Sequence, residues 1–435
     1  MNLSFTTRAV LTGLLILLGI GVALTYERTQ TRQVGFDGVG MQLTQSDSEL
    51  EAQLARNVAP PSLPPAPEGG ARAIDTYENV QVLGHLSTAD FTRTMTAMTL
   101  WVAPEQGCAY CHNTENLASD ELYPKVVARR MIQMTMHLNQ DWDEHVGVNG
   151  TGVTCFTCHR GNPVPEYIWF DQLPADEHGV TATNAEQNAP AWAAGLTSLP
   201  DNAFETFLGD DPAEIRVQGD DWRPGNRSSI KQTEWTYGLM VHFSRSLGVN
   251  CTHCHNSRQW SDWSQSPVTR TTAWYGIRMV RDINENYLSS IQDVLPANRL
   301  GPTGDAPNAN CMTCHQGAYR PLLGQSMLRD YPVFARWVEQ PERTPPPPPE
   351  VPSVPADSTI VDPAAAAADT VVAPPGEGAT PPVTPAAPSP AAPPSPASTS
   401  AMSAPDAMPS EAAPPAAPAT PRAVPAPAEA EPASP

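Results

Sequence analysis

Residues 123–160 read YPKVVARRMIQMTMHLNQDWDEHVGVNGTGVTCFTCHR. The stretch contains a helix-forming run with several Met residues, a His beyond that run, and a Cys-x-x-Cys-His motif at its end. In such a motif two Cys sulfurs can form thioether bonds to one porphyrin, and the adjacent His imidazole can bind its iron. Cys155, Cys158 and His159 are therefore predicted to attach a haem.

The motif occurs four times, and the four copies use all 8 Cys of the chain. A redox dithiol, a zinc site or a disulfide framework would not place a His directly after every second Cys. We therefore predict four covalently bound haems c. The predicted attachment residues are Cys108, Cys111, Cys155, Cys158, Cys251, Cys254, Cys311 and Cys314, and the predicted proximal iron ligands are His112, His159, His255 and His315.

Apolar periodicity predicts a helix before each motif. The first helix follows the capping sequence Ser87-Thr-Ala-Asp90, the second starts at Pro124, and the others span about residues 231–247 and 272–288. The unit of helix, turn and haem motif thus occurs as two pairs, which indicates internal duplication. The expected fold is a mainly α multihaem cytochrome with two pseudo-symmetric pairs of these units and little β structure.

Each predicted haem needs a second axial ligand, and the choice matters because Met raises the reduction potential and a second His lowers it. Met95 and Met240 lie on the predicted helices that precede the first and third motifs. Met98 is the rival of Met95, and His242 is the rival of Met240. The alternative role for such Met side chains is gap-filling in the core.

The second and fourth haems have more candidates, and sequence spacing does not choose between them. For the fourth haem, symmetry between the pairs nominates Met279, while His145 is an unassigned alternative. For the second haem, the competing residues are Met131, Met134, Met136 and His137.

Residues 9–26 carry no charge between Arg8 and Glu27, and their length is near the lower limit for a membrane span. We predict an uncleaved transmembrane anchor, with residues 1–8 on the cytoplasmic side; a cleaved signal peptide is the alternative. An anchor and a signal peptide would both direct the rest of the chain out of the cytoplasm. This agrees with covalent haem attachment, which takes place outside the cytoplasm. The expected location is the periplasmic side of the inner membrane.

Residues 341–435 form a tail that holds 29 of the 49 Pro and lacks Trp, Tyr, Phe and Cys. Such a segment cannot bury enough apolar surface to offset its ordering entropy, so we predict that it is disordered. The other predicted segments are a linker or irregular strap at 27–86, a first haem pair at 87–160, a connecting segment at 161–225 and a second haem pair at 226–340.

The chain is acidic, with a formal net charge of −21. The tail has 10 acidic and 2 basic residues, so it contributes −8 and the rest of the chain contributes −13. This balance argues against nucleic acid as a partner. For a redox protein it favours a basic soluble partner, because opposite charges steer brief encounters; acidity for solubility alone is the alternative.

Long motifs of the chain resemble the tetrahaem cytochrome subunit of purple-bacterial-type photosynthetic reaction centres, over about residues 75–335. The resemblance implies Met95, Met131 and Met240 as sixth ligands of the first three haems. It implies ligation of the fourth by His315 and His145, so that Met279 becomes a packing residue. The matching stretches are MTAMTLWVAPEQGCAYCH (95–112), YPKVVARRM (123–131), GVTCFTCHRG (152–161), YGLMVHFSRSLGVNCTHCHN (237–256), WYGIRMVRDIN (274–284) and CMTCHQG (311–317).

The resemblance also implies a role as an electron carrier and not as an enzyme. Such a subunit docks on the L and M subunits of the reaction centre and re-reduces the photo-oxidised bacteriochlorophyll pair, with the third haem nearest that pair. Electrons enter from a soluble cytochrome c or a high-potential iron–sulfur protein, and antenna subunits are further candidate partners. The alternative function is a membrane-anchored tetrahaem quinol dehydrogenase, but the two-pair layout with Met-bearing helices argues against it.

Overall fold

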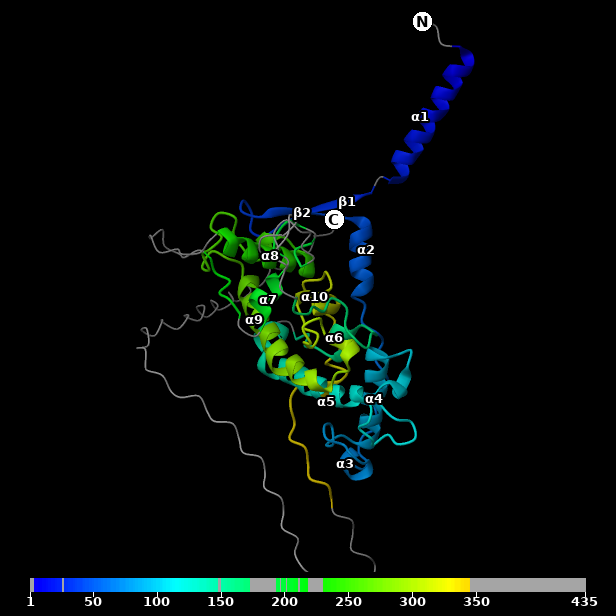
Figure 1. Cartoon of the computed structure of the whole chain (residues 1–435), viewed down its shortest axis with the longest axis vertical. Helices are drawn as coiled ribbons and strands as arrows, with labels where there is room; N and C mark the ends of the chain where they lie inside the picture. The colour runs from blue at the N-terminus through cyan, green and yellow to red at the C-terminus, as the bar shows by residue number, and fades with distance from the viewer. Residues whose placement is uncertain are drawn as a thin grey trace, which may run out of the picture. The chain divides into compact units, whose positions relative to one another are not determined.

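The computed structural model describes residues 4–25, 27–147, 150–172, 193–195, 197–200, 202–209, 212–217 and 230–344 (Figure 1). The predicted disordered tail beyond residue 344 and much of the predicted connecting segment lie outside these residues. Helices dominate the part of the chain that is described, and it contains one small two-stranded sheet. The prediction of a mainly α fold with little β structure is therefore confirmed.

A long helix precedes each haem motif. At the start of the first of these helices the Asp90 N–H donates to the Ser87 hydroxyl, and Pro124 lies in the first turn of the second, so both predicted starts are confirmed. The fourth helix ends earlier than predicted, because the backbone switches to a π-helix, η5, over Ile283–Leu288. The four helices are α4 (Thr88–Val102), α5 (Tyr123–Asp141), α8 (Ile230–Leu247) and α9 (Thr269–Asp282).

Shorter elements connect these helices and carry the motifs. The short α-helices are α3 (Ala73–Thr76), α6 (Cys155–His159), α7 (Ala203–Leu208) and α10 (Cys311–His315). The remaining turns of helix are η1 (Gly107–Tyr110), η2 (Asp143–Gly147), η4 (Cys251–His253), η6 (Ser289–Val294), η7 (Ala297–Arg299), η8 (Pro321–Gly324) and η9 (Pro332–Phe334).

The segment 27–86, expected as a linker or irregular strap without strands, contains regular structure instead. β1 (Thr29–Val34) and β2 (Met41–Ser46) form an antiparallel hairpin, and α2 (Asp47–Arg56) follows directly. The strand sequences TQTRQV and MQLTQS are mostly polar and mostly exposed. Because hydrophobic alternation is the signal that identifies strands, such a hairpin escapes detection from the sequence.

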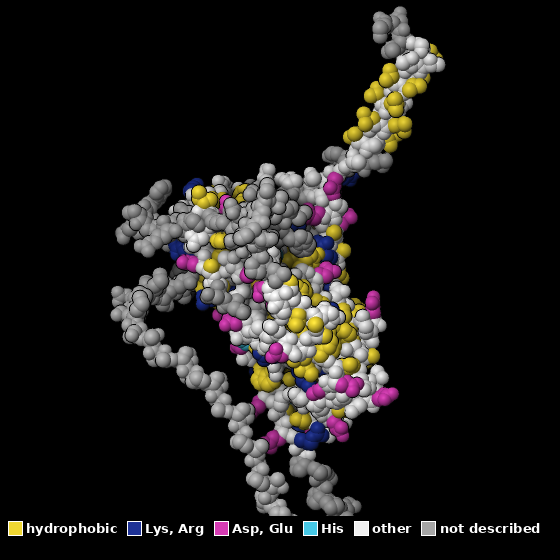
Figure 2. Space-filling view, viewed as in Figure 1, with side chains coloured by type: hydrophobic (Ala, Val, Ile, Leu, Met, Phe, Trp, Pro, Cys, Tyr) yellow, Lys and Arg dark blue, Asp and Glu magenta, His cyan; other side chains and the backbone are white. Residues whose placement is uncertain are grey.

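α1 (Phe5–Thr25) covers the predicted membrane anchor. Residues Phe5–Ala23 have a mean hydropathy of 1.8, and 0 % of this window is buried against the rest of the chain. Figure 2 shows hydrophobic side chains along this helix. An apolar helix of this length, with no protein surface to cover it, has the properties of a membrane span.

Buried apolar side chains of the described residues form three clusters. In the first, Trp101 of α4 packs edge-on against Tyr331, with ring centroids 4.6 Å apart, beside Met136 of α5 and Phe334. The second joins α7, α8 and α9, and the third joins α5 to α9. The main side chains of the second are Phe207, Leu208, Leu239, Ile277 and Val280, and those of the third are Leu138, Met279, Ile283 and Ala309.

The hairpin is bonded to the third haem motif through Thr252, a residue of η4. The Met41 N–H donates to Thr252 Oγ1 at 2.9 Å, and that hydroxyl donates to the Val34 carbonyl at 2.6 Å. The Thr252 side chain is fully buried, and Gly35, at φ +95°, lies so close that a Cβ there would be 2.5 Å from the Thr252 carbonyl oxygen. The segment that follows α1 is therefore fastened to the third motif.

Replacing Thr252 with Val should release the hairpin, because the isosteric side chain can neither accept from Met41 nor donate to Val34. Losing these buried hydrogen bonds costs about 1–3 kcal/mol. We expect amide hydrogen exchange at Met41 to accelerate by roughly 10- to 100-fold, since every 1.4 kcal/mol is about tenfold. Thr31→Val, which removes an exposed hydroxyl pair with Thr44 in the same hairpin, is the control. Unchanged exchange at Met41 in T252V would contradict the docking.

Candidate haem-attachment sites

The four haem motifs have two local geometries that alternate along the chain. The first and third motifs form 3₁₀ turns, at η1 and η4. The second and fourth form one-turn α-helices, α6 and α10. The two halves of the chain therefore repeat the same local structures in the same order.

α6 and α10 begin with the same reciprocal cap. The Thr154 N–H donates to Thr157 Oγ1 at 3.0 Å, and the Asn310 N–H donates to Thr313 Oγ1 at 3.0 Å. The Thr157 N–H in turn donates to Thr154, and the Thr313 N–H donates to Asn310. Such capping boxes satisfy the free N–H groups at a helix start, so they fix the short turns on which the Cys sulfurs sit.

A glycine after each of these two motifs ties it to a long helix. The Gly161 N–H donates to the Trp101 carbonyl of α4 at 2.8 Å, and the Gly317 N–H donates to the Ser246 carbonyl of α8 at 2.8 Å. Both glycines have φ +88°, a region that L side chains rarely occupy. The second motif is thus fixed to the helix that leads into the first, and the fourth to the helix that leads into the third.

The second and fourth motifs lie side by side. Cys158 Sγ is 2.7 Å from Cys314 Sγ. α6 packs against α4 and α10, and α10 packs against α8. Because α4 leads into the first motif and α8 into the third, contacts link the motifs in the order one, two, four, three.

The four histidines predicted as proximal ligands share one hydrogen-bond pattern. In each, Nδ1 lies within hydrogen-bond distance of a backbone carbonyl, which can only accept, so Nδ1 carries the proton and Nε2 keeps its lone pair. Metal-ligating histidines use this arrangement to fix the orientation of the ring. The pairs are His112 with Leu117 at 2.9 Å, His159 with Asn162 at 2.8 Å, His255 with Trp260 at 2.9 Å and His315 with Ala318 at 2.9 Å.

His145 has the same pattern and lies beside His315, the histidine of the fourth motif. Its Nδ1 donates to the Thr272 carbonyl at 2.9 Å. The ring centroids of His145 and His315 are 6.0 Å apart, with an interplanar angle of 70°. Two imidazoles that bind one metal from opposite sides, each through a bond of about 2 Å, have ring centroids roughly 6 Å apart. The pair therefore fits the axial ligation of one iron.

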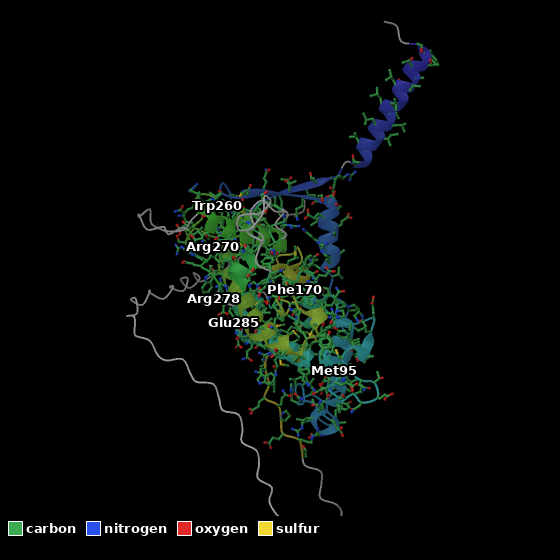
Figure 3. The ribbon with its side chains drawn as sticks, viewed as in Figure 1. Met95, Phe170, Trp260, Arg270, Arg278 and Glu285 are labelled. Carbon is green, nitrogen blue, oxygen red and sulfur yellow. The ribbon has the colours of Figure 1, made fainter. Side chains whose placement is uncertain are left out.

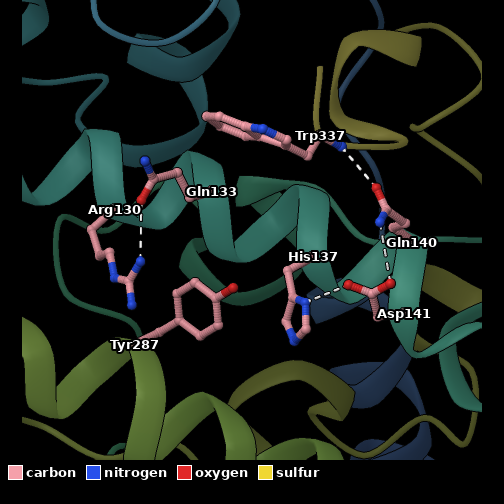
Figure 4. Close-up of a pocket in the computed structure, with 7 residues that line it drawn as sticks. All are labelled: Arg130, Gln133, His137, Gln140, Asp141, Tyr287 and Trp337. Atoms are coloured by element: carbon pink, nitrogen blue, oxygen red, sulfur yellow. Dashed lines mark hydrogen bonds and ion pairs between the residues drawn. The ribbon is translucent and has the colours of Figure 1, made fainter. Parts of the chain in front are cut away.

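The rival histidines are engaged on both ring nitrogens. His137 Nδ1 is 2.6 Å from Asp141 Oδ2, and its Nε2 is 2.6 Å from Asp282 Oδ2. Figure 4 shows the first of these contacts in a pocket of about 350 Å³ that is lined by polar side chains of α5 together with Tyr287 and Trp337. In His242, Nδ1 bonds the Ala193 carbonyl at 3.2 Å and Nε2 lies 3.1 Å from Ser246 Oγ. These rings are committed to structural hydrogen bonds.

The candidate methionines differ in burial. Met95 and Met98 of α4 are partly buried against the first cluster, and Figure 3 labels Met95. Met131 and Met240 are also partly buried, whereas Met136 is 0 % exposed within the first cluster. Met134 and Met279 pack with the third cluster, where Met279 is 5 % exposed. Met136 and Met279 thus have the surroundings of core side chains.

Burial keeps the candidate imidazoles neutral. Desolvation lowers the pKa of His145, His159 and His255, and it lowers the pKa of His315 to about 4. A metal binds the neutral imidazole through its free lone pair. These rings therefore have the protonation state that iron ligation requires at neutral pH.

Sequence reasoning missed Gly276, the residue that makes room for His145. A Cβ at Gly276 would lie 2.4 Å from His145 Cε1, closer than any real contact. The glycine is inside α9, where it costs about 1 kcal/mol relative to Ala. Its presence in the middle of a helix was the available signal, since such a glycine often marks a close approach.

The chain carries four Cys-x-x-Cys-His motifs, and the histidine of each is oriented by a hydrogen bond from Nδ1 to a backbone carbonyl. These features define a c-type cytochrome. The chain belongs to the family described as photosynthetic reaction centre cytochrome C subunit, whose sequence model matches residues 26–335. It is 51 % identical over 303 residues to the photosynthetic reaction center cytochrome c subunit of Rubrivivax gelatinosus, covering 69 % of this chain and 82 % of that one. For the same subunit of Thermochromatium tepidum the identity is 49 % over 304 residues, covering 69 % and 74 %. For that of Roseobacter denitrificans it is 44 % over 329 residues, covering 71 % and 86 %.

Family membership confirms the predicted class of function. The chain is an electron-transfer subunit of a photosynthetic reaction centre, it carries covalently bound haem c, and it associates with the photosynthetic membrane. The quinol dehydrogenase considered as an alternative is set aside. Within the described residues, no group of three or more His, Cys, Asp or Glu side chains is arranged to hold a separate metal ion.

Thr157→Val should destabilise the fold of the second motif without altering a predicted iron ligand. The substitution leaves the Thr154 N–H, which is buried, without its acceptor, at a cost of about 1–3 kcal/mol. We expect a lower thermal unfolding midpoint and a smaller fraction of chains with haem on Cys155 and Cys158, measured by mass spectrometry. Thr157→Ser keeps the hydroxyl and is the control. Equal attachment in T157V and T157S would show that the cap has no such role.

Proposed function

We propose that the chain holds four haems and passes electrons from a soluble periplasmic carrier to the photo-oxidised bacteriochlorophyll pair of the reaction centre. The observation that carries the proposal is the linked order of the motifs, one, two, four, three, with the hairpin that follows the apolar helix bonded to the third. A chain of contacting sites that begins next to a membrane anchor suits electron transfer between a soluble donor and a membrane-bound oxidant.

The proposed roles of the site residues follow from their chemistry. Each bound haem iron accepts and releases one electron, and the protein supplies attachment, orientation and potential. The eight motif cysteines hold the groups covalently. The proposed axial pairs are His112 with Met95, His159 with Met131, His255 with Met240, and His315 with His145.

The hydrogen-bond patterns support these pairs. The His145 ring lies 6.0 Å from the His315 ring and uses Nδ1 for the Thr272 carbonyl, whereas His137 and His242 use both ring nitrogens elsewhere. Met136 and Met279 are core side chains. The thioether ligands favour the reduced iron, and the second imidazole of the fourth site favours the oxidised iron, so the fourth site would have a lower potential than the second.

The two ends of the linked order suggest a direction. β1 starts at Thr29, four residues after α1 ends at Thr25, and the hairpin bonds Thr252 of the third motif. The third motif would therefore lie near the membrane, against the L and M subunits. Exposed acidic side chains near the first motif, including Glu105 and Glu115, would attract a basic donor. Antenna subunits are further candidate partners.

Purification from native membranes in mild detergent tests the proposal. We expect the chain to co-elute with bacteriochlorophyll, to carry four haems by mass spectrometry, and to show haem oxidation after a flash. A soluble cytochrome c or high-potential iron–sulfur protein should restore the reduced state. Fewer than four haems, or no haem oxidised by light, would overturn the proposal.

Gly276→Ala tests the pairing of His145 with His315. The added Cβ should push the His145 ring away, so the low-potential redox wave and the bis-histidine signal in electron paramagnetic resonance should be lost or shifted. Gly238→Ala is the matched control in α8, because its Cβ would have its nearest contact at 3.6 Å. That variant should keep the signal and gain roughly 0.5–1 kcal/mol of stability. An unchanged signal in G276A would refute the pairing.

A further inference from the structure

Arg160, the residue directly after the second motif, bridges the second and fourth motifs. Its Nε donates to the Thr157 carbonyl of the second motif at 2.9 Å. Its Nη2 donates to the Cys314 carbonyl of the fourth motif at 3.1 Å. One guanidinium therefore contacts the backbone of two haem-attachment sites at once.

The other contacts of Arg160 fix it to the end of α2. Nη1 donates to the Arg56 carbonyl at 2.7 Å, and Nη2 also lies 3.3 Å from Asn57 Oδ1. Asn57 is 1 % exposed, and its oxygen also accepts from the Leu322 N–H at 3.2 Å. Its amide nitrogen donates to a carbonyl of α2 and to the Gln316 carbonyl. A fully bonded buried amide of this kind holds the guanidinium in one position.

The positive charge of Arg160 is not cancelled locally. Its acceptors are backbone carbonyls and an amide oxygen, and no carboxylate of the described residues forms an ion pair with it. An arginine stays charged at all physiological pH values. Since the site is partly buried, its charge is screened less than a charge on the surface.

We propose that the Arg160 guanidinium, positioned by Asn57, is one positive charge shared by the second and fourth haem sites that raises the reduction potential of both. The inference rests on the proposed four-haem function. Reduction removes one positive charge from an iron centre, so a fixed cation nearby stabilises the reduced form relative to the oxidised form. Because the guanidinium contacts both motifs, it shifts both reduction potentials in the same direction. It thereby raises the potentials of the two middle sites of the series relative to those of the first and third sites.

The test is a potentiometric titration of the intact reaction-centre complex carrying Arg160→Gln. Loss of the charge should lower the second and fourth waves together, each by a tenfold change in the reduction equilibrium or more, which is about 59 mV for one electron. Arg160→Lys keeps the charge and should leave both waves near their wild-type positions. Met131→His and His145→Met identify which waves belong to these two sites.

Arg93→Gln is the matched control. Its guanidinium donates to the carbonyls of Leu63, Pro64 and Asp330, so the variant loses the same charge and similar bonds outside these two motifs. We expect it to leave the second and fourth waves in place. Asn57→Asp keeps the oxygen that faces Arg160 but adds a negative charge, and should lower both waves.

The outcomes separate this inference from the proposed function. A wild-type titration that takes up fewer than four electrons per chain would refute the four-haem function itself. With four waves present, an R160Q variant that moves neither wave, or one wave alone, would overturn the shared charge, as would equal shifts in R160Q and R160K. Should R160Q fail to retain haem, N57D decides: lowered second and fourth waves support the inference, and unchanged waves reject it.

Discussion

Buried hydrogen bonds from Arg160 and Asn57 join the second haem motif to the fourth, where α6 of one half of the chain packs against α10 of the other. Each half repeats a 3₁₀ motif followed by an α-helical one. The α-helical motifs meet each other, and the 3₁₀ motifs follow α4 and α8, against which the α-helical motifs pack. The contact between α6 and α10 thereby links the two pairs of motifs into one series, and Arg160 and Asn57 bridge it by hydrogen bonds.

Backbone carbonyls orient the histidines proposed as iron ligands in the same way at every motif. Each proximal imidazole gives its Nδ1 proton to a carbonyl a few residues along the chain, and His145 does so to α9. The ring is fixed before any metal binds, so little ordering entropy is lost on ligation. Gly276 completes the fourth site by leaving space where any side chain would collide with His145.

Sequence patterns predicted the long helices well and the segment 27–86 poorly. Helix starts at Ser87 and Pro124 carry local capping signals, which do not depend on distant residues. The hairpin that bonds Thr252 carries no such signal, because its polar strands are defined by pairing and docking. The same limit applies to Asn57, which lies in a segment expected to be an irregular strap. Its side chain bonds Arg160 and Gln316, the residues directly after the second and fourth motifs.

The sequence by itself determined the chemistry of this protein. Four Cys-x-x-Cys-His motifs predict covalent haem attachment, because thioether and imidazole spacing is a local property of five residues. The tertiary structure decided which distant groups meet: His145 with His315, the second motif with the fourth, and the β1–β2 hairpin with the third. These contacts join residues 100 or more positions apart, so they depend on packing and on the pairing of buried polar groups, which local patterns do not encode.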